Sequence, residues 1–159
     1  MSDLGLFKGR RVLLTGHTGF KGMWLALLLL RAGAEVTGFA LDAPTEDGTE
    51  ALRRLGILKE LRDVRVDVCE LSALRRAFEE ARPEIVFHLA AQPIVRTSYR
   101  QPVDTFATNV MGTVNLLECV RTSDTVRSVL IVTTDKVYEN KEWAWGYREN
   151  EPLMGYDPY

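Results

Sequence analysis

Hydrophobic and polar positions follow two different rhythms along the chain. Short runs rich in β-branched and apolar residues alternate with longer stretches whose apolar positions recur every three or four residues. Strands are expected at residues 11–15, 35–40, 64–67, 84–90 and 128–133. Helices are expected at residues 21–31, 50–61, 73–81 and 102–121. This alternation predicts an α/β fold, a doubly wound parallel sheet with helices on both faces.

Local signals refine the ends of these elements. Gly33 stops the first helix, and Ser72 is the expected N-cap of the third. Pro102 suits the first position of the last helix, while residues 44–49 are polar and turn-like. One apolar stripe, at spacings of three and four, marks the face on which the last helix is expected to pack. Its members are Val103, Phe106, Val110, Met111, Val114 and Leu117.

Composition and charge narrow the function classes. The chain has 159 residues, of which 46% are hydrophobic, and a net charge of −2. That length suits one domain, and the charge balance argues against a nucleic-acid groove or a membrane-surface protein. Cys69 and Cys119 stand 50 positions apart, and no Cys/His spacing typical of a metal site accompanies them. Two reduced cysteines, no metal and a cytoplasmic location are therefore expected.

A glycine-rich turn follows the first expected strand, with the sequence Thr-Gly-His-Thr-Gly-Phe-Lys-Gly over residues 15–22. Gly16 permits a tight turn, Gly19 leaves room for a pyrophosphate at the helix N-terminus, and Gly22 allows close helix packing. A tight turn without a ligand is the competing interpretation. Lys21 opposes the helix dipole, a conflict that a bound anion removes, so Lys21 and His17 are expected near cofactor phosphates.

Acidic residues after the next two strands suit the adenosine half of a dinucleotide. Asp42 follows the second strand and is placed to accept the ribose hydroxyls, which favours NAD over NADP. No arginine stands beside it in the sequence to take a 2′-phosphate. An aspartate in a loop without a ligand is the alternative. Asp67 and Val68, after the third strand, are expected to meet the adenine edge.

Five motifs, at the strand exits and on the last helix, together carry a recognisable signature. They are TGHTGFKG, DVCEL at 67–71, HLAAQ at 88–92, NVMGTVN at 109–115 and TTDKVY at 133–138. The combination resembles the extended short-chain dehydrogenase/reductase family, and within it the members that act on nucleotide sugars. The resemblance implies a Rossmann-type domain that binds NAD. The implied cofactor-binding residues are Gly16, His17, Gly19, Phe20, Lys21, Gly22, Asp42, Asp67, Val68, Leu89, Ala90, Ala91, Asn109 and Thr133.

The same resemblance implies a 4,6-dehydration. Hydride leaves C4 of the hexose for NAD, water is lost from C5 and C6, and the hydride returns to C6. Thr134 is expected to bond the O4 oxygen, Asp135 to protonate the departing hydroxyl, and Lys136 to act as the base at C5. Burial is expected to tune both pKa values, and the two side chains are candidates for an ion pair. Tyr159 matches the family's catalytic tyrosine.

Substrate, partner and domain organisation are also matters of resemblance. Gln92, Arg96 and Ser98 are expected to border the sugar pocket, and CDP-glucose is the expected nucleotide hexose. The family's lysine partner of the tyrosine falls at position 163. Residues 1–159 are therefore expected to be an NAD-binding domain truncated at Tyr159, without the C-terminal substrate domain and with little activity alone.

The resemblance also bears on assembly and pathway, and two alternative functions stay open. The full-length protein is expected to be a homodimer, and its pathway to supply deoxysugars for surface polysaccharides such as the O-antigen of lipopolysaccharide. One alternative is a 4-epimerase or ketoreductase of the same fold. The other is a dinucleotide-binding module without catalysis.

Overall fold

A five-stranded parallel sheet forms the centre of the molecule, in the order β3-β2-β1-β4-β5. The computed structural model describes residues 4–159. The strands are β1 (Arg11–Thr15), β2 (Glu35–Ala40), β3 (Arg62–Arg65), β4 (Ile85–His88) and β5 (Ser128–Ile131). All four strand pairings are parallel, which confirms the doubly wound sheet predicted from the sequence.

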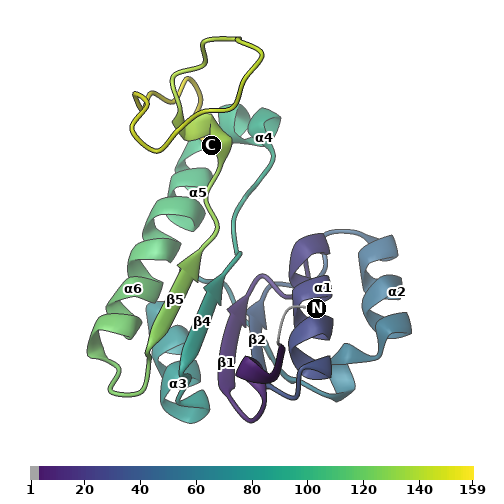
Figure 1. The fold of residues 1–159 in the computed structure, drawn as a ribbon. Helices are drawn as coiled ribbons and strands as arrows, with labels where there is room; N and C mark the ends of the chain where they lie inside the picture. Colours follow the sequence, from purple (N-terminus) through teal and green to yellow (C-terminus); the bar gives the residue numbers. More distant parts are fainter. Residues whose placement is uncertain (1–3) are drawn as a thin grey trace.

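Helices cover both faces of this sheet (Figure 1). They are α1 (Phe20–Arg31), α2 (Glu46–Leu55), α3 (Leu71–Ala81), α4 (Val95–Arg100), α5 (Pro102–Phe106) and α6 (Gly112–Thr122). A π-helical segment, η3 (Ala107–Met111), joins α5 to α6. Short 3-10 turns occur at Leu4–Phe7, Ile57–Lys59 and Asp135–Val137.

Each face of the sheet carries its own apolar cluster. Val12, Leu14, Leu29 and Leu52 belong to the cluster under α1 and α2. On the other face, Leu13, Phe39, Leu74, Val86 and Leu116 pack under α3 and α6. Because adjacent strand residues point to opposite faces, Leu13 and Leu14 enter different clusters. The burial of both faces explains the largely apolar sequences of β1 and β2, whereas the edge strands β3 and β5 are more exposed.

Several predicted element boundaries are wrong, each for a local reason. Residues 44–49 are not a turn: α2 already begins at Glu46, because the Thr45 hydroxyl accepts the Gly48 N–H and caps the helix. Gly56, with φ of +70°, then ends α2 well before residue 61. The third strand pairs over Arg62–Arg65 instead of 64–67, and α3 begins one residue before Ser72.

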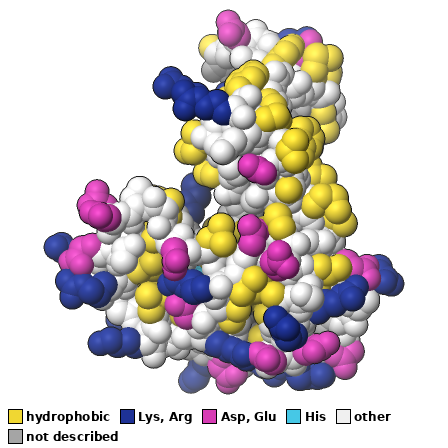
Figure 2. Space-filling view, turned by 180° about the vertical axis from the view of Figure 1, so that it is seen from behind, with side chains coloured by type: hydrophobic (Ala, Val, Ile, Leu, Met, Phe, Trp, Pro, Cys, Tyr) yellow, Lys and Arg dark blue, Asp and Glu magenta, His cyan; other side chains and the backbone are white. Residues whose placement is uncertain are grey.

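The apolar stripe of the last helix does not face the core. Its six residues, Val103 to Leu117, are 42–77% exposed, whereas Leu116 and Cys119 point inward. Space-filling shows hydrophobic side chains along the flank that carries α5 and α6 (Figure 2). The helix therefore has a second apolar face, which the described residues leave uncovered.

Candidate functional site

The glycine turn lies directly at the carboxyl end of β1. Gly16 adopts φ of +75°, and a Cβ there would stand 2.8 Å from the Ala90 nitrogen. Gly22 is tighter still, because its Cβ would lie 2.0 Å from the Gly16 oxygen. Two glycines are thus required by backbone approach alone. They bring the start of α1 and the exit of β4 against the turn.

Gly19 differs from its neighbours. It is the N-cap of α1, and a Cβ there would meet only the Gly16 oxygen, at 3.4 Å. The space beside it is open, so packing within the chain does not demand a glycine. We call this open space at Gly19, at the N-terminus of α1, the cradle. The first-turn N–H groups of α1 face it, as an anion site requires. Phe20 and Lys21, both exposed, flank it.

The His17 side chain does not line this cradle, which corrects the expectation that it lies near phosphates. Its ring is fully buried, and Nε2 lies 2.8 Å from Oδ1 of Asp63 on β3. Burial lowers the pKa of His17, partly offset by Asp63. A Cβ at Gly38 would reach the ring at 2.5 Å, so the imidazole fills the gap beside β2. Only the backbone of His17 remains available to a ligand.

Asp42 stands at the exit of β2 and is 94% exposed at its side chain. Contrary to expectation, an arginine lies beside it: Arg65 Nη1 is 3.2 Å from Asp42 Oδ1. Arg65 also donates to Asp63 at 2.7 Å. Burial raises the pKa of Asp63, but the hydrogen bonds and charges of Arg65 and His17 outweigh it. The pKa is therefore lowered on balance. The sequence hides this arginine because it arrives from the neighbouring strand.

The residues that follow β3, Asp67 and Val68, are engaged within the protein. Asp67 accepts the backbone N–H of Cys69 at 2.8 Å, which holds the turn into α3. Val68 is buried, and a Cβ on Gly112 of α6 would come within 2.6 Å of its Cγ1. Its side chain therefore belongs to the core, which leaves only its backbone for an adenine edge.

The segment after β4 is held by the helix that follows it. Asn109, in η3, accepts the Gln92 N–H at 2.8 Å and donates to the Gln92 carbonyl at 3.2 Å. The Gln92 side chain donates to Thr105, and the Ser98 hydroxyl is buried and donates to the Val95 carbonyl. Both side chains therefore make hydrogen bonds within the protein. Arg96 is exposed.

Backbone groups at the same exit contact β1. The N–H groups of Leu89 and Ala90 both donate to the Thr15 hydroxyl, each at 3.1 Å. Ala91 follows as an exposed residue. The segment from Leu89 to Gln92 therefore forms a wall beside the glycine turn.

A second group of polar residues lies beyond β5, at the same edge of the sheet. Thr133 is exposed, and the Thr134 hydroxyl accepts the Lys136 N–H at 3.2 Å. Asp135 and Lys136 line a cavity of about 300 Å³. The other residues around this cavity are Tyr138, Asn140, Tyr147, Tyr156 and Asp157.

Two expectations for this group are not met in residues 4–159. Asp135 and Lys136 are both exposed, so the burial that was expected to tune them is not present here. No ion pair joins them among the described residues, and the Asp135 carboxylate accepts the Thr134 hydroxyl at 3.3 Å. Both side chains stay open to solvent at the mouth of the cavity.

The last residues fold back onto this group. Met154 donates its N–H to the Val137 carbonyl at 2.9 Å, and Tyr138 pairs with Leu153. Asp157 lines the cavity, and its Oδ1 accepts the Tyr159 N–H at 2.9 Å. Tyr159 is therefore tied through its backbone to Asp157, a residue of the cavity wall.

One side of this cavity is aromatic, which the sequence pattern hardly predicts. Tyr138 and Tyr147 stack at 5.1 Å between ring centroids, and Trp143 packs against Tyr147 at 5.5 Å. The clustering of aromatic residues after position 138 was the one signal. Their mutual stacking follows from the loop conformation, which no periodicity describes.

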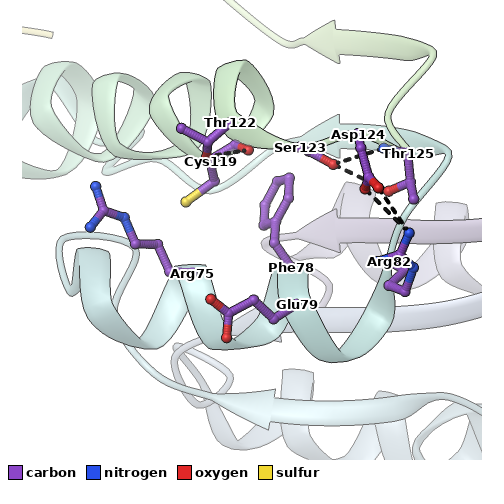
Figure 3. A pocket seen from close by; sticks show the side chains of 9 residues that line it. All are labelled: Arg75, Phe78, Glu79, Arg82, Cys119, Thr122, Ser123, Asp124 and Thr125. Atoms are coloured by element: carbon purple, nitrogen blue, oxygen red, sulfur yellow. Dashed lines mark hydrogen bonds and ion pairs between the residues drawn. The ribbon is translucent and has the colours of Figure 1, made fainter.

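A different cavity, of about 250 Å³, lies between α3 and α6 (Figure 3). Arg82 and Thr125 border it just before β4 and β5 begin, so it opens at the amino edge of the sheet. In Figure 3, the Cys119 side chain points from α6 into the space between the two helices, on the side of Arg75. This cavity is separate from the glycine turn, which lies at the carboxyl edge.

Membrane-spanning helices and clusters of metal-ligand side chains are both absent from residues 4–159. No helix in that range is long and apolar enough to cross a membrane. Nor does it contain three or more His, Cys, Asp or Glu side chains placed together to hold a metal ion. Cys69 and Cys119 are both free.

A parallel sheet with a glycine turn after its first strand and polar residues at the same edge defines a protein of the dinucleotide-binding type. The family model of GDP-mannose 4,6 dehydratase matches residues 13–159. The chain belongs to this family, which confirms the resemblance to enzymes of nucleotide sugars.

Individual relatives agree. The chain is 53% identical to a CDP-glucose 4,6-dehydratase of Salmonella typhimurium, over 100% of this chain and 44% of the relative. It is 34% identical to a probable dTDP-glucose 4,6-dehydratase of Sinorhizobium fredii, over 94% of this chain and 45% of that protein. The chain thus spans less than half the length of these relatives.

Solved structures show the same architecture. A UDP-glucose 4-epimerase of Thermus thermophilus, solved in complex with NAD, superposes with a TM-score of 0.80. The sequence identity is 32%, over 94% of this chain and 46% of that one. The doubly wound Rossmann-type fold is therefore shared with epimerases as well as dehydratases.

Proposed function

We propose that this chain is the NAD-binding part of a nucleotide-sugar 4,6-dehydratase, with CDP-glucose as the substrate. The observation that carries the proposal is the placement of the open cradle at Gly19 and the Thr134-Asp135-Lys136 group at one edge of one sheet. The relatives are more than twice as long. The complete reaction is therefore proposed for the protein that carries this chain, and residues 1–159 alone are expected to show little activity.

The residues around the glycine turn suit a dinucleotide. Gly16, Gly19 and the first turn of α1 receive the pyrophosphate, with Phe20, Lys21 and Gly22 around it. Asp42 takes the adenosine ribose, while Asp67 and the Val68 backbone take the adenine. The remaining contacts come from Leu89, Ala90, Ala91, Asn109 and Thr133. Bound by these residues, NAD would supply the hydride acceptor for C4 of the hexose and the hydride donor for C6.

The group beyond β5 performs the proton transfers. Thr134 donates a hydrogen bond to O4, Lys136 removes the C5 proton, and Asp135 protonates the C6 hydroxyl as it leaves as water. Tyr159 removes the O4 proton, and Arg96 contributes to substrate binding. Since Asp135 and Lys136 are exposed in these residues, we expect the remaining part of the protein to cover the cavity and supply the burial that their roles require.

Turnover tests this proposal in the full-length protein. Incubation with CDP-glucose and NAD should yield a 4-keto-6-deoxy product lighter than the substrate by one water, detected by mass spectrometry. Lys136→Met should lower the rate by about 10²-fold or more, the usual contribution of a general base. Lys141→Met, in the same loop, is the matched control and should keep the rate.

Other outcomes separate the alternatives. A product of unchanged mass with an inverted C4 centre would identify a 4-epimerase. NAD binding without any change in the sugar would identify a binding module. An unaltered rate for Lys136→Met would refute the assignment of Lys136.

A homodimer is proposed on the exposed stripe of α5 and α6. The stripe is apolar over the whole length of the helix, as an interface core is. Val114→Lys places a charge in its middle and should shift the full-length protein toward monomer in sedimentation. Unchanged sedimentation would exclude this face as the interface.

Location and cofactor affinity complete the proposal. We place the protein in the cytoplasm, where both cysteines stay reduced, and in the supply of deoxysugars for surface polysaccharides.

Lys21→Ile should lower the affinity for NAD and reduce its dependence on salt, because a cation near the phosphates is removed.

A further inference from the structure

One buried histidine has no part in the proposed chemistry, yet it lies between the elements that form the cofactor site. His88 ends β4 and is 2% exposed. Its Nδ1 lies 2.7 Å from the Thr15 hydroxyl at the end of β1. Its Nε2 lies 3.0 Å from the Thr113 hydroxyl in α6. The ring therefore bridges a strand and a helix that are otherwise held by apolar packing.

The surrounding hydrogen bonds fix the tautomer of this ring. The Thr15 hydroxyl already accepts the N–H groups of Leu89 and Ala90, which use both of its lone pairs. The Leu89 N–H is shared with the Thr15 carbonyl, at the longer distance of 3.3 Å. Its single hydrogen must then go to His88 Nδ1, so Nδ1 carries no proton. Consequently Nε2 carries the hydrogen of a neutral ring and donates it to the Thr113 hydroxyl.

The series continues into the helix. Having accepted from His88, the Thr113 hydroxyl donates to the Asn109 carbonyl at 2.7 Å. Asn109 lies in the π-helical segment and holds the Gln92 backbone through both ends of its amide. With the opposite tautomer, the Thr15 oxygen would receive three donors and the Asn109 carbonyl would lose its hydroxyl partner. Only the Nε2–H form satisfies every group in the series.

We propose that His88 is a positioning residue of the cofactor site, held as the Nε2–H tautomer, which ties the exit of β1 to the π-helical segment that carries Asn109. Through Thr15 it orients the Leu89 and Ala90 backbone, and through Thr113 it orients the amide that holds Gln92. The whole wall beside the glycine turn depends on this series. The role rests on the proposed function, whereas the tautomer itself does not.

Nitrogen NMR of the imidazole tests the tautomer in the full-length protein labelled at histidine. The signals that vanish in His88→Gln identify the ring. They should show Nδ1 as the unprotonated nitrogen and Nε2 as the protonated one, and should keep that pattern below the ordinary histidine pKa of about 6.5. A ring protonated at Nδ1, or one that titrates near 6.5, would overturn the proposal.

Paired variants test the positioning role. Thr113→Val removes the acceptor of the Nε2–H and should weaken NAD binding about fivefold, the scale of one neutral hydrogen bond. Thr113→Ser keeps the hydroxyl and should restore the wild-type affinity. Thr122→Val is the matched control, because Thr122 makes the same bond to the carbonyl four residues earlier, at the far end of α6.

Amide hydrogen exchange provides a readout that needs no cofactor. Thr113→Val should speed exchange at Leu89 and Ala90, whose N–H groups donate to Thr15 and not to Thr113, whereas Thr113→Ser and Thr122→Val should not. Equal exchange in all variants would overturn the coupling. If the wild-type protein binds no NAD, the proposed function fails, while the tautomer and the exchange data still decide the role of this series.

Discussion

Two regions at the carboxyl edge of the sheet differ sharply in how they are built. Around the glycine turn, Thr15, His17 and His88 are buried and hydrogen-bonded to other elements. Beyond β5, Asp135 and Lys136 are exposed and bonded within their own turn. The region proposed for the cofactor is thus buried and joined to other elements, whereas the region proposed for catalysis is an open surface. The two regions therefore differ in burial: the residues around the glycine turn are already enclosed, and those beyond β5 are not.

Adding a methyl group at one glycine in each region should give the largest contrast. Gly22→Ala places a Cβ within 2.0 Å of the Gly16 oxygen, a backbone atom that cannot move aside. We expect a loss of about 3 kcal/mol in the free energy of unfolding, at the upper end for overpacking. Gly146→Ala, with nothing within 4 Å of its Cβ, should be nearly neutral. Similar denaturation midpoints for both variants would contradict the contrast.

Acid should weaken the turn region next. Burial lowers the pKa of His88 to about 4, against an unfolded value of about 6.5. The unfolded state then binds the proton more readily, so stability is lost as the pH falls from about 6.5 to 4. The His88 contribution to this loss is about 3 kcal/mol. Urea unfolding across this range measures it, and His88→Gln should flatten the profile; parallel profiles would disprove the assignment.

Removing one hydroxyl from each region should give a smaller difference. Thr15→Val leaves the Ala90 amide and His88 Nδ1 without their partner in a buried site, while the Leu89 amide keeps only the Thr15 carbonyl. This should cost about 2–3 kcal/mol. Tyr147→Phe removes bonds to Lys141 and Asn140 at the surface, where water replaces them, and should cost about 0.5 kcal/mol. Thermal unfolding compares the two variants, and equal losses would erase the distinction between the regions.

Local signals were enough to predict the sheet and the glycine turn. A short apolar run followed by glycines specifies a strand, a turn and a helix start within a dozen residues. The conformation of Gly16 and the close approach at Gly22 are both consequences of that local geometry. The same reasoning located Asp135 and Lys136 just past β5, because parallel strands end at one edge.

Side-chain surroundings could not be predicted in the same way. His17 meets Asp63, 46 positions later, because β2 and β3 pair in one particular register. Arg65 reaches Asp42 for the same reason, although no arginine adjoins Asp42 in the sequence. The stripe from Val103 to Leu117 was predicted as an apolar face, but periodicity does not say what covers that face.

The sequence by itself determined the order of strands and helices, the phosphate-type turn and the residues available for chemistry. Only the tertiary structure decided that the His17 ring fills the gap beside β2 and that His88 joins β1 to α6. It also decided that Asp135 and Lys136 remain exposed. The physical reason is range. Backbone conformation follows from neighbours along the chain, whereas burial, partners and tautomers depend on groups that strand register and helix packing bring from far away.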